Sequence, residues 1–173
     1  MKNTDLIPEI ANDMTPRKVK NSQTETHAIV HPDNTNALHN AFGGYLMGLM
    51  DVAACVVAFN HAGRKVNTVS IDGVRFFRPT AVGTILNIHA SMNRVFNTSM
   101  EIGVKVLGID PQVSWQPQVI CHAYMTFVAL DENGRPTPIP SIIPETEDEI
   151  RRYEEAGIRR EAKKKLAASL ENK

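Results

Sequence analysis

The sequence has no excess of either charge. Its 173 residues include 19 Lys and Arg and 19 Asp and Glu, so the formal net charge is +0. A protein that binds nucleic acid mainly through the phosphates needs an excess of cations. The composition therefore argues against nucleic acid as the main partner, although it leaves room for a local basic patch.

Cysteine is scarce as well. Cys55 and Cys121 both lie in apolar runs, and neither belongs to a Cys/His cluster with metal-ligand spacing. They are expected to be small core residues in a reducing compartment, and we expect no metal site. The N-terminus MKNTDLIPEI lacks the apolar stretch of a secretory signal. A cytoplasmic protein is the expectation.

Charge is almost missing from one long stretch. Between Asp33 and Arg64 the one Asp, Glu, Lys or Arg is Asp51, in the middle of the apolar segment 40–61. A helix that is apolar nearly all round is buried in a protein core or in a membrane. Two glycines near the start, the central Asp51 and the strand-like patterns that follow favour a buried helix of a soluble domain. A buried carboxylate is costly unless it is paired, hydrogen-bonded or used in chemistry.

This helix is expected to begin near 42–44 and to end at 60–63, with Gly63 just past its last turn. Gly43 and Gly44 lower the helix propensity of the first turn by about 1 kcal/mol each. Such glycines either permit close packing or leave backbone N–H groups open to a ligand, and the sequence favours neither.

Strand-like patterns surround the helix. The expected strands are 26–30, 66–78, 85–95, 100–107 and 119–130, with a bulge at Gly73 and a loop at 108–118. Short turns between successive strands imply an antiparallel sheet. One apolar helix followed by about four long strands indicates an α+β fold, in which the sheet curls around the helix.

The two ends of the chain look different from this central domain, which we place at 26–143. Residues 1–25 are polar and aperiodic, and we expect a loose arm without a regular element. Residues 144–173 are expected to form a charged C-terminal helix that starts at a capping box, Thr146-Glu147-Asp148-Glu149. Its apolar face is thin, so a peripheral position is predicted, with Gly157 as a weak point.

Several motifs together carry a family resemblance. They are Asp33-Asn34-Thr35-Asn36, Phe42-Gly43-Gly44, Met50-Asp51 with Ala53-Ala54, Val74-Arg75-Phe76-Phe77-Arg78-Pro79, Thr98-Ser99-Met100-Glu101 and AYMTFVAL followed by Asp131. The chain resembles the hotdog-fold acyl-CoA thioesterases over roughly residues 30–160. The match is close to the bacterial YciA-like and animal cytosolic brain-type acyl-CoA hydrolases.

The resemblance implies an enzyme that hydrolyses fatty acyl-CoA to free fatty acid and CoA, without a metal or organic cofactor. Asp51 would be the general base or the nucleophile, and Asn36 of the partner subunit would orient water or the carbonyl. The N–H of Gly44, or of Gly43, would bind the thioester oxygen. The resemblance also implies a homodimer with shared active sites, usually assembled into a trimer of dimers.

Coenzyme A has further requirements, because its phosphates need cations and its pantetheine arm needs an apolar slot. The candidates for phosphate and hydroxyl contacts are Arg75, Arg78, Arg94, Thr98 and Ser99. The expected walls of the substrate site are Gly43, His39, Phe42 and Phe76. The chain departs from the family pattern at Leu38-His39-Asn40 and at Gly83-Thr84.

Three other functions stay open at this point. A non-catalytic acyl-CoA-binding domain would leave Asp51 without a task. A dehydratase would need a catalytic His, and His39 lacks the Phe-Pro-Gly-type context of those enzymes. A purely structural protein would show no response to CoA.

Overall fold

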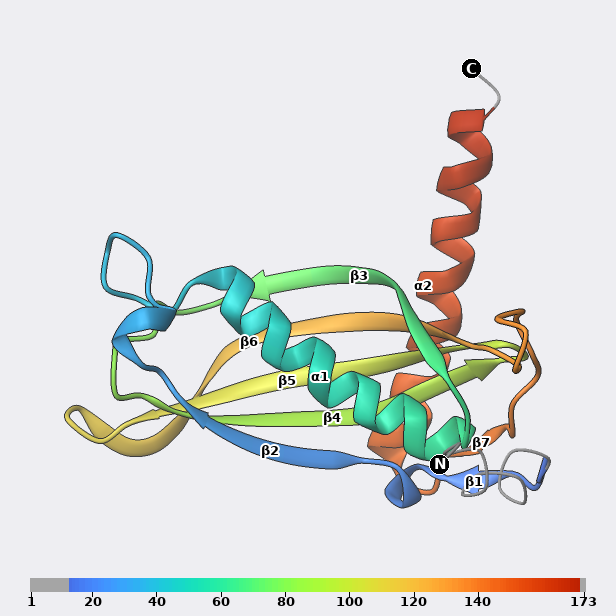
Figure 1. Ribbon diagram of the computed structural model, residues 1–173, viewed down its shortest axis with the longest axis horizontal. Coiled ribbons are helices and arrows are strands. Elements are labelled where there is room, and N and C mark those ends of the chain that lie inside the picture. The colour runs from blue at the N-terminus through green and yellow to red at the C-terminus, as the bar shows by residue number, and fades with distance from the viewer. Residues whose placement is uncertain (1–12, 172–173) are drawn as a thin grey trace, which may run out of the picture.

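The computed structural model describes residues 13–171 and shows a curved antiparallel sheet around one long helix (Figure 1). This confirms the α+β class expected from the sequence. The elements in chain order are β1 Arg17–Lys18, η2 Val19–Asn21, β2 Thr24–Ile29, η3 Pro32–Asn34, α1 Gly43–Ala62, β3 Val66–Phe76, β4 Ile85–Phe96, β5 Ser99–Asp110, β6 Ser114–Ala129, β7 Ile142–Ile143 and α2 Glu147–Glu171.

The main sheet has the strand order β2-β4-β5-β6-β3, and every neighbouring pair is antiparallel. The strands that precede and follow α1 in the chain, β2 and β3, therefore form the two edges of the sheet. Gly73 has φ of 57° and lies in a register shift of β3 against β6, so the expected bulge is confirmed.

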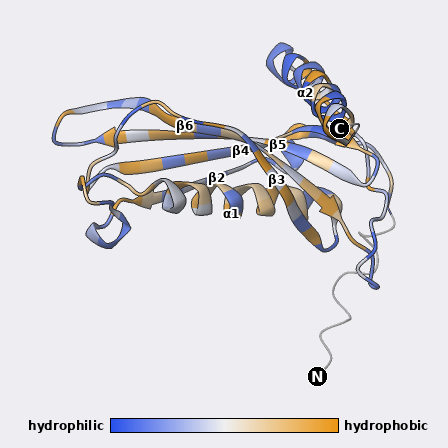
Figure 2. Cartoon of the chain, turned by 90° about the horizontal axis from the view of Figure 1, so that it is seen from above, coloured by the Kyte–Doolittle hydropathy of each residue, from blue (hydrophilic) through white to orange (hydrophobic). Residues whose placement is uncertain are grey.

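The core lies between α1 and one face of the sheet (Figure 2). Alternate residues of β4 and β5 point toward α1, including Leu86, Ile88, Ile102 and Val106, which are fully buried. Burying each large apolar side chain contributes about 1.5–3 kcal/mol. The strands expected at 85–95 and 100–107 are thus confirmed, and their buried face packs against α1.

Helix α1 is long and apolar enough to cross a membrane by length and composition, but it packs on the sheet as a core helix. Its burial is one-sided. Val52, Val56 and Phe59 are 64%, 41% and 43% exposed in the single chain. The expectation of a helix buried all round is therefore wrong for one copy, because the sheet covers one side of α1 and no described segment covers the other.

The hairpin between β5 and β6 corrects a second expectation. Residues 108–118, expected as a loop, mostly extend the two strands, and the turn is reduced to 111–113. Pro117 lies inside β6, next to the register shift between Gly108 and Asp110. A proline is tolerated there because an irregular ladder does not require its missing N–H.

Helix α2 packs on the face of the sheet opposite α1 and then extends beyond the body of the protein (Figures 1 and 2). Arg159 donates to Glu101 at 2.7 Å and 3.2 Å and lies 3.7 Å above the Tyr124 ring. Asn93 also donates to Glu101, at 2.9 Å. The helix is thus attached by a largely buried polar network, which its thin apolar pattern could not predict.

The arm expected at residues 1–25 is partly wrong. Residues 1–12 lie outside the described part of the chain, but β1, η2 and the start of β2 lie within 13–25. β1 pairs in parallel with β7, and Val19 is buried in the core. The Arg17 guanidinium donates to the His61 carbonyl at 2.6 Å, which connects this segment to the end of α1.

Candidate functional site

The loop that leads into α1 is held by one asparagine side chain. Asn36 Oδ1 accepts hydrogen bonds from the backbone N–H groups of Leu38 and Asn40, at 2.9 Å and 3.3 Å. His39 has a φ of 56° and donates its N–H to the Asn36 carbonyl at 2.9 Å. Asn36 therefore shapes its own loop through Oδ1, while its amide Nδ2 has no hydrogen bond to a described residue.

The first turn of α1 leaves two backbone donors available. Phe42 is the N-cap and makes no side-chain capping bond, and the N–H of Tyr45 already donates to the Phe42 carbonyl. The N–H groups of Gly43 and Gly44 have no carbonyl acceptor within the helix, as is general for the first turn. No acidic residue lies in this turn, so the positive end of the helix dipole is uncompensated. An oxyanion would be stabilised here.

Two phenyl rings flank these donors. A Cβ on Gly44 would overlap Cε1 of Phe42, and a Cβ on Gly43 would lie 3.3 Å from Cζ of Phe76. The glycines therefore let the two rings approach the helix end closely. The result is an apolar surrounding for two polar N–H groups, which suits a thioester carbonyl.

A cavity of about 450 Å³ opens beside this helix end. Its walls come from the 36–43 loop, from α1 and from the segment that follows β3. Four residues proposed from the sequence line it together: Asn36, Gly43, Phe76 and Arg78. The structure thus gathers into one place residues that are up to 42 positions apart, as Asn36 and Arg78 are.

Asp51 lies two turns further along α1 and does not line this cavity. It is half-buried, and its Oδ1 accepts a hydrogen bond of 2.8 Å from the Thr68 hydroxyl on β3. The described residues provide no hydrogen bond to Oδ2. One oxygen is therefore fixed, and the other can accept a proton from water.

Thr68 was missed by sequence reasoning. It is one of several exposed polar residues of β3, and only the pairing of β3 with β6 brings it over α1. No local pattern could have identified it.

The remaining residues near this end lie on its rim. Phe42 is 56% exposed, and His39 is also exposed. Arg75 lies on the exposed end of β3, with its guanidinium 5.7 Å from the Phe77 ring centroid. Burial, and then the Arg75 charge, lower the pKa of His122 below its usual value. These positions are compatible with contacts to a large ligand that enters from the surface.

Arg94, Thr98 and Ser99 lie at the opposite end of the sheet, around the β4–β5 turn (Figure 1). Arg94 donates to the Tyr153 carbonyl at 3.3 Å, and Ser99 Oγ accepts from Arg160 at 3.0 Å. One chain therefore does not bring these three residues to the site that contains Gly43.

Cys121 offers no alternative nucleophile. Burial raises the pKa of the Cys121 thiol to about 11, and its Sγ lies 3.6 Å from Met50 Sδ in the core. A thiol with that pKa is protonated near neutral pH. Within residues 13–171 there is also no group of three His, Cys, Asp or Glu side chains that could hold a metal ion.

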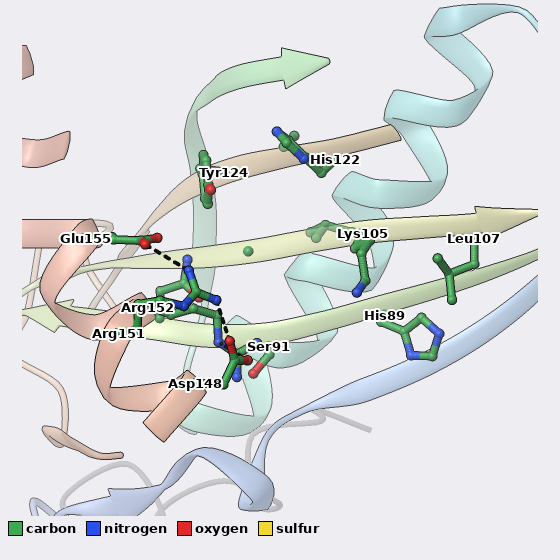
Figure 3. A pocket seen from close by; sticks show the side chains of 14 residues that line it. His89, Ser91, Lys105, Leu107, His122, Tyr124, Asp148, Arg151, Arg152 and Glu155 are labelled. Carbon is green, nitrogen blue, oxygen red and sulfur yellow. Dashed lines mark hydrogen bonds and ion pairs between the residues drawn. The ribbon is translucent and has the colours of Figure 1, made fainter. Parts of the chain in front are cut away.

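A second cavity of about 450 Å³ lies on the outer face of the sheet beneath the start of α2 (Figure 3). His89, Lys105 and His122 line it from the sheet. Its two arginines are already engaged in ion pairs, Arg151 with Asp148 and Glu155, and Arg152 with Asp148. None of the residues proposed from the sequence lines this cavity, which we interpret as a structural feature of the α2 interface.

The fold and this helix-end site define a class of protein: a hotdog domain with a carboxylate on its central helix. The sequence profile of the thioesterase superfamily matches residues 38–114. Protein VdlD of Helicobacter pylori is 43% identical over 136 residues, which cover 77% of this chain and 75% of that protein.

The chain belongs to the hotdog thioesterase superfamily. The cytosolic acyl coenzyme A thioester hydrolase of Rattus norvegicus is 35% identical over 156 residues, which are 89% of this chain and 40% of that enzyme. The chain therefore corresponds to less than half of the rat enzyme.

Solved structures agree with this assignment. An acyl-CoA hydrolase from Staphylococcus aureus superposes with a TM-score of 0.84 and 32% identity, over 91% of this chain and 96% of that one. It has also been solved with butyryl-CoA and CoA. A hexameric acyl-CoA thioesterase gives a TM-score of 0.85 and 36% identity, over 89% and 98% of the two chains.

The spacing of residues altered in the Staphylococcus aureus enzyme bears on the site. Its solved alanine variants replace an Asn, an Asp 15 positions later and a Thr 17 positions after that. Asn36, Asp51 and Thr68 have the same spacing in this chain.

Proposed function

We propose that this protein hydrolyses acyl-CoA thioesters to a free acid and CoA, with Asp51 and the start of α1 as its catalytic centre. One observation carries the proposal. A carboxylate fixed by Thr68 at 2.8 Å lies on the same helix whose uncapped first turn presents two N–H groups. Base and oxyanion site are the two elements that thioester hydrolysis requires.

In this mechanism the site is shared between two copies of the chain: the thioester carbonyl oxygen accepts hydrogen bonds from the N–H groups of Gly44 and Gly43 of one copy, and Asp51 comes from the other copy. Asp51 Oδ2 takes a proton from a water molecule as the water oxygen attacks the carbonyl carbon. The tetrahedral intermediate then collapses, the C–S bond breaks, and the proton passes to the CoA thiolate. Water and side chains of the protein are sufficient for these steps, so no metal or organic cofactor is required.

Direct attack by Asp51 is the alternative chemistry. The carboxylate would then form a mixed anhydride with the acyl group, and water would hydrolyse it in a second step. Single-turnover hydrolysis in ¹⁸O-labelled water tests this alternative. General-base catalysis places the label in the product acid. If Asp51 attacks and water then adds to the Asp51 carbonyl carbon of the anhydride, the label appears in the Asp51 carboxylate and the first product acid is unlabelled.

We further propose that the active site is shared between two copies of the chain. Asn36 Nδ2 and Asp51 do not meet within one chain, and Arg94, Thr98 and Ser99 lie at the far end of the sheet. A twofold axis next to edge strand β3 would reverse the second copy and bring its far end toward the first copy's helix start. The helix start of the second copy, with its Asn36 and Gly43, would face Asp51 of the first copy, and that Asn36 would orient water or the carbonyl.

The exposed apolar side chains support the same arrangement. Val52, Val56 and Phe59 on α1 and Val69 on β3 are exposed in one chain, and they lie beside the edge of the sheet. Contiguous apolar patches of this kind mark interaction sites. A trimer of such dimers is the proposed full assembly, in line with the hexameric relatives, and the cytoplasm is the proposed location.

The test is thiol release from a series of acyl-CoAs, from acetyl to palmitoyl, by the wild type and Asp51→Asn. The variant should keep its fold and assembly but turn over at least about 100-fold more slowly, because it lacks the general base. Asp110→Asn is the matched control, since Asp110 accepts a hydrogen bond from the Gln112 N–H in the β5–β6 hairpin and lines no cavity near Gly43. Turnover close to that of the wild type in Asp51→Asn would overturn the mechanism. Binding of CoA esters without turnover by the wild type would instead indicate a non-catalytic binding protein.

A further inference from the structure

The last part of α2 runs past the edge of the sheet. The helix crosses the outer face from strand to strand: Arg159 donates to Glu101 on β5, and Lys163 donates to Ser70 on the edge strand β3 at 3.0 Å. From Lys163 the helix continues to Glu171. At 1.5 Å per residue this α2 extension, residues 164–171, is about 12 Å long. It passes β3 and lies over no further strand in the described part of the chain (Figure 1).

The side of the helix that faces the sheet carries two leucines beyond this edge. Leu166 and Leu170 follow Lys163 at helical spacing, three and seven residues on, so they continue the face that contains Arg159 and Lys163. The two leucines are 61% and 62% exposed in the single chain. Leucines on the sheet-facing side of an otherwise highly charged helix indicate that a further apolar surface covers them in the assembly.

The shared active site determines what lies beyond β3, so this step rests on the proposed function. Asp51 lies beside Thr68 on β3, whereas Gly43 lies beside Phe76 at the far end of that strand. For Asp51 of one copy to reach Gly43 of the other, Thr68 of one β3 must lie opposite Phe76 of an antiparallel β3. The twofold axis then passes near Asp72, which is halfway between them.

The charges near this axis agree with that position. The axis brings two Asp72 carboxylates toward each other, and like charges opposite one another destabilise paired strands. Lys163 forms an ion pair with Asp72 within each copy and so neutralises both carboxylates. The same ion pair holds α2 over the point where it leaves its own sheet.

Beyond the axis the α2 extension reaches an aromatic surface. Neighbouring strands are about 4.8 Å apart, so about 12 Å of helix spans two strands, here β3 and β6 of the second copy. The outer face of each copy carries Phe77 and His122 there, with ring centroids 5.2 Å apart. Phe77 is 47% exposed in the single chain. Exposed leucines and an exposed phenyl ring therefore come to the same place.

We propose that the α2 extension of each copy packs on the outer face of its partner's sheet, with Leu166 and Leu170 against the partner's Phe77 and the partner's His122. Phe77 also lines the cavity beside the start of α1. The extension therefore supports a wall of the very site to which its own copy supplies Asp51. The twofold axis produces this contact twice in each dimer.

A photo-crosslinking probe tests the contact directly in the full-length protein. The probe variant is Leu170→benzoylphenylalanine, and the control is Ala168→benzoylphenylalanine, because two residues along a helix lie on nearly opposite sides. After irradiation we expect the probe at 170 to give a covalent dimer whose joined peptide contains the partner's Phe77 or the partner's His122. The probe at 168 should join neither. Crosslinks from position 170 only to its own chain, or to another part of the partner, would overturn the proposal.

Subunit exchange measures the strength of the contact. Tagged and untagged copies of one variant are mixed, and native mass spectrometry follows the appearance of dimers that carry one tag. Leu166→Asp and Leu170→Asp should exchange about 100-fold faster than the wild type, about tenfold for each of the two contacts that would bury a carboxylate. Ala168→Asp introduces the same charge at the same helix end and should exchange at the wild-type rate. Leu166→Met keeps the apolar volume and should also exchange slowly. Equal rates in the three aspartate variants would overturn the proposal.

Thiol release keeps this inference separate from the proposed function. A wild type that hydrolyses no acyl-CoA would refute the proposed function, while the crosslinks from position 170 would still decide the contact. A wild type that is active, with exchange unchanged by Leu166→Asp, would refute the contact and leave the proposed function intact.

Discussion

The hydrogen bond between Thr68 and Asp51 allows a sharp prediction. Thr68→Val removes the hydroxyl that donates to Asp51 Oδ1 at 2.8 Å and replaces it with a methyl group of similar size. Valine keeps the β-branched shape that strand β3 favours. Because Thr68 is exposed at the sheet edge, the free energy of unfolding should change by no more than about 0.5 kcal/mol. The effect should therefore fall on catalysis.

The size of that effect follows from the exposure of the bond. A hydrogen bond to a charged group contributes about 1.5–3 kcal/mol. Asp51 is half-buried and Thr68 is exposed in the single chain, so water can replace part of the lost interaction. The lower figure, about 1.5 kcal/mol, corresponds to roughly a tenfold change in rate. Since the hydroxyl orients the base and does not touch the substrate, kcat should fall about tenfold with KM unchanged.

The assay compares kcat and KM for one acyl-CoA in the wild type, Thr68→Val and Thr68→Ser. Serine retains the hydroxyl, so it should recover most of the lost kcat. A wild-type kcat in the Thr68→Val variant would refute the positioning role of Thr68. If kcat fell as much in Thr68→Ser as in Thr68→Val, the packing of the methyl group, and not the hydrogen bond, would be responsible.

Two further predictions concern stability and assembly. His61 is fully buried, its Nε2 lies 2.8 Å from the Pro140 carbonyl, and burial lowers its pKa below 6.5. The unfolded chain therefore binds a proton at a higher pH than the folded chain, so stability should fall as the pH drops below about 6.5. The Tm of His61→Gln should fall less than that of the wild type between about pH 7.5 and pH 5.5, and equal slopes would contradict this. Val56→Asp should dissociate the proposed dimer, because assembly would bury an unpaired carboxylate. Light scattering should then give the monomer mass for Val56→Asp, whereas the exposed hairpin variant Val113→Asp should remain at least dimeric; a dimeric Val56→Asp would place the interface elsewhere.

Much of the fold was predictable because local patterns determine it. The period of the apolar residues located α1 and the long strands, and Gly63, with φ of 64°, ends α1 where expected. The 108–118 segment was misjudged because proline and polar residues look like a loop when the pairing partner is unknown. The segment 17–21 was missed because two-residue strand β1 exists through its partner β7, which lies more than 120 positions away.

The candidate site, like the fold, was only partly predictable from the sequence. Gly43 and Gly44 could be singled out because a glycine pair at a helix start is a local pattern, whereas Asn36 was proposed through the family resemblance of its motif. No local pattern indicated the hydrogen bond from Thr68 to Asp51, because it joins a helix to a strand. The charged network of Glu101, Asn93 and Arg159 was hidden for the same reason, because Arg159 on α2 is 58 positions from Glu101 on β5.

The sequence by itself determined that one nearly uncharged helix with a single aspartate would be enclosed by an antiparallel sheet. The period of the apolar residues and the positions of the glycines involve neighbouring residues only. They therefore favour a helix or a strand locally, without any tertiary contact. Only the tertiary structure decided which hydroxyl meets Asp51, which face of α1 is left exposed and which side of α2 faces the sheet. Those outcomes depend on contacts between residues far apart in the chain. Such contacts form, and contribute to stability, only when the sheet and the helices pack together.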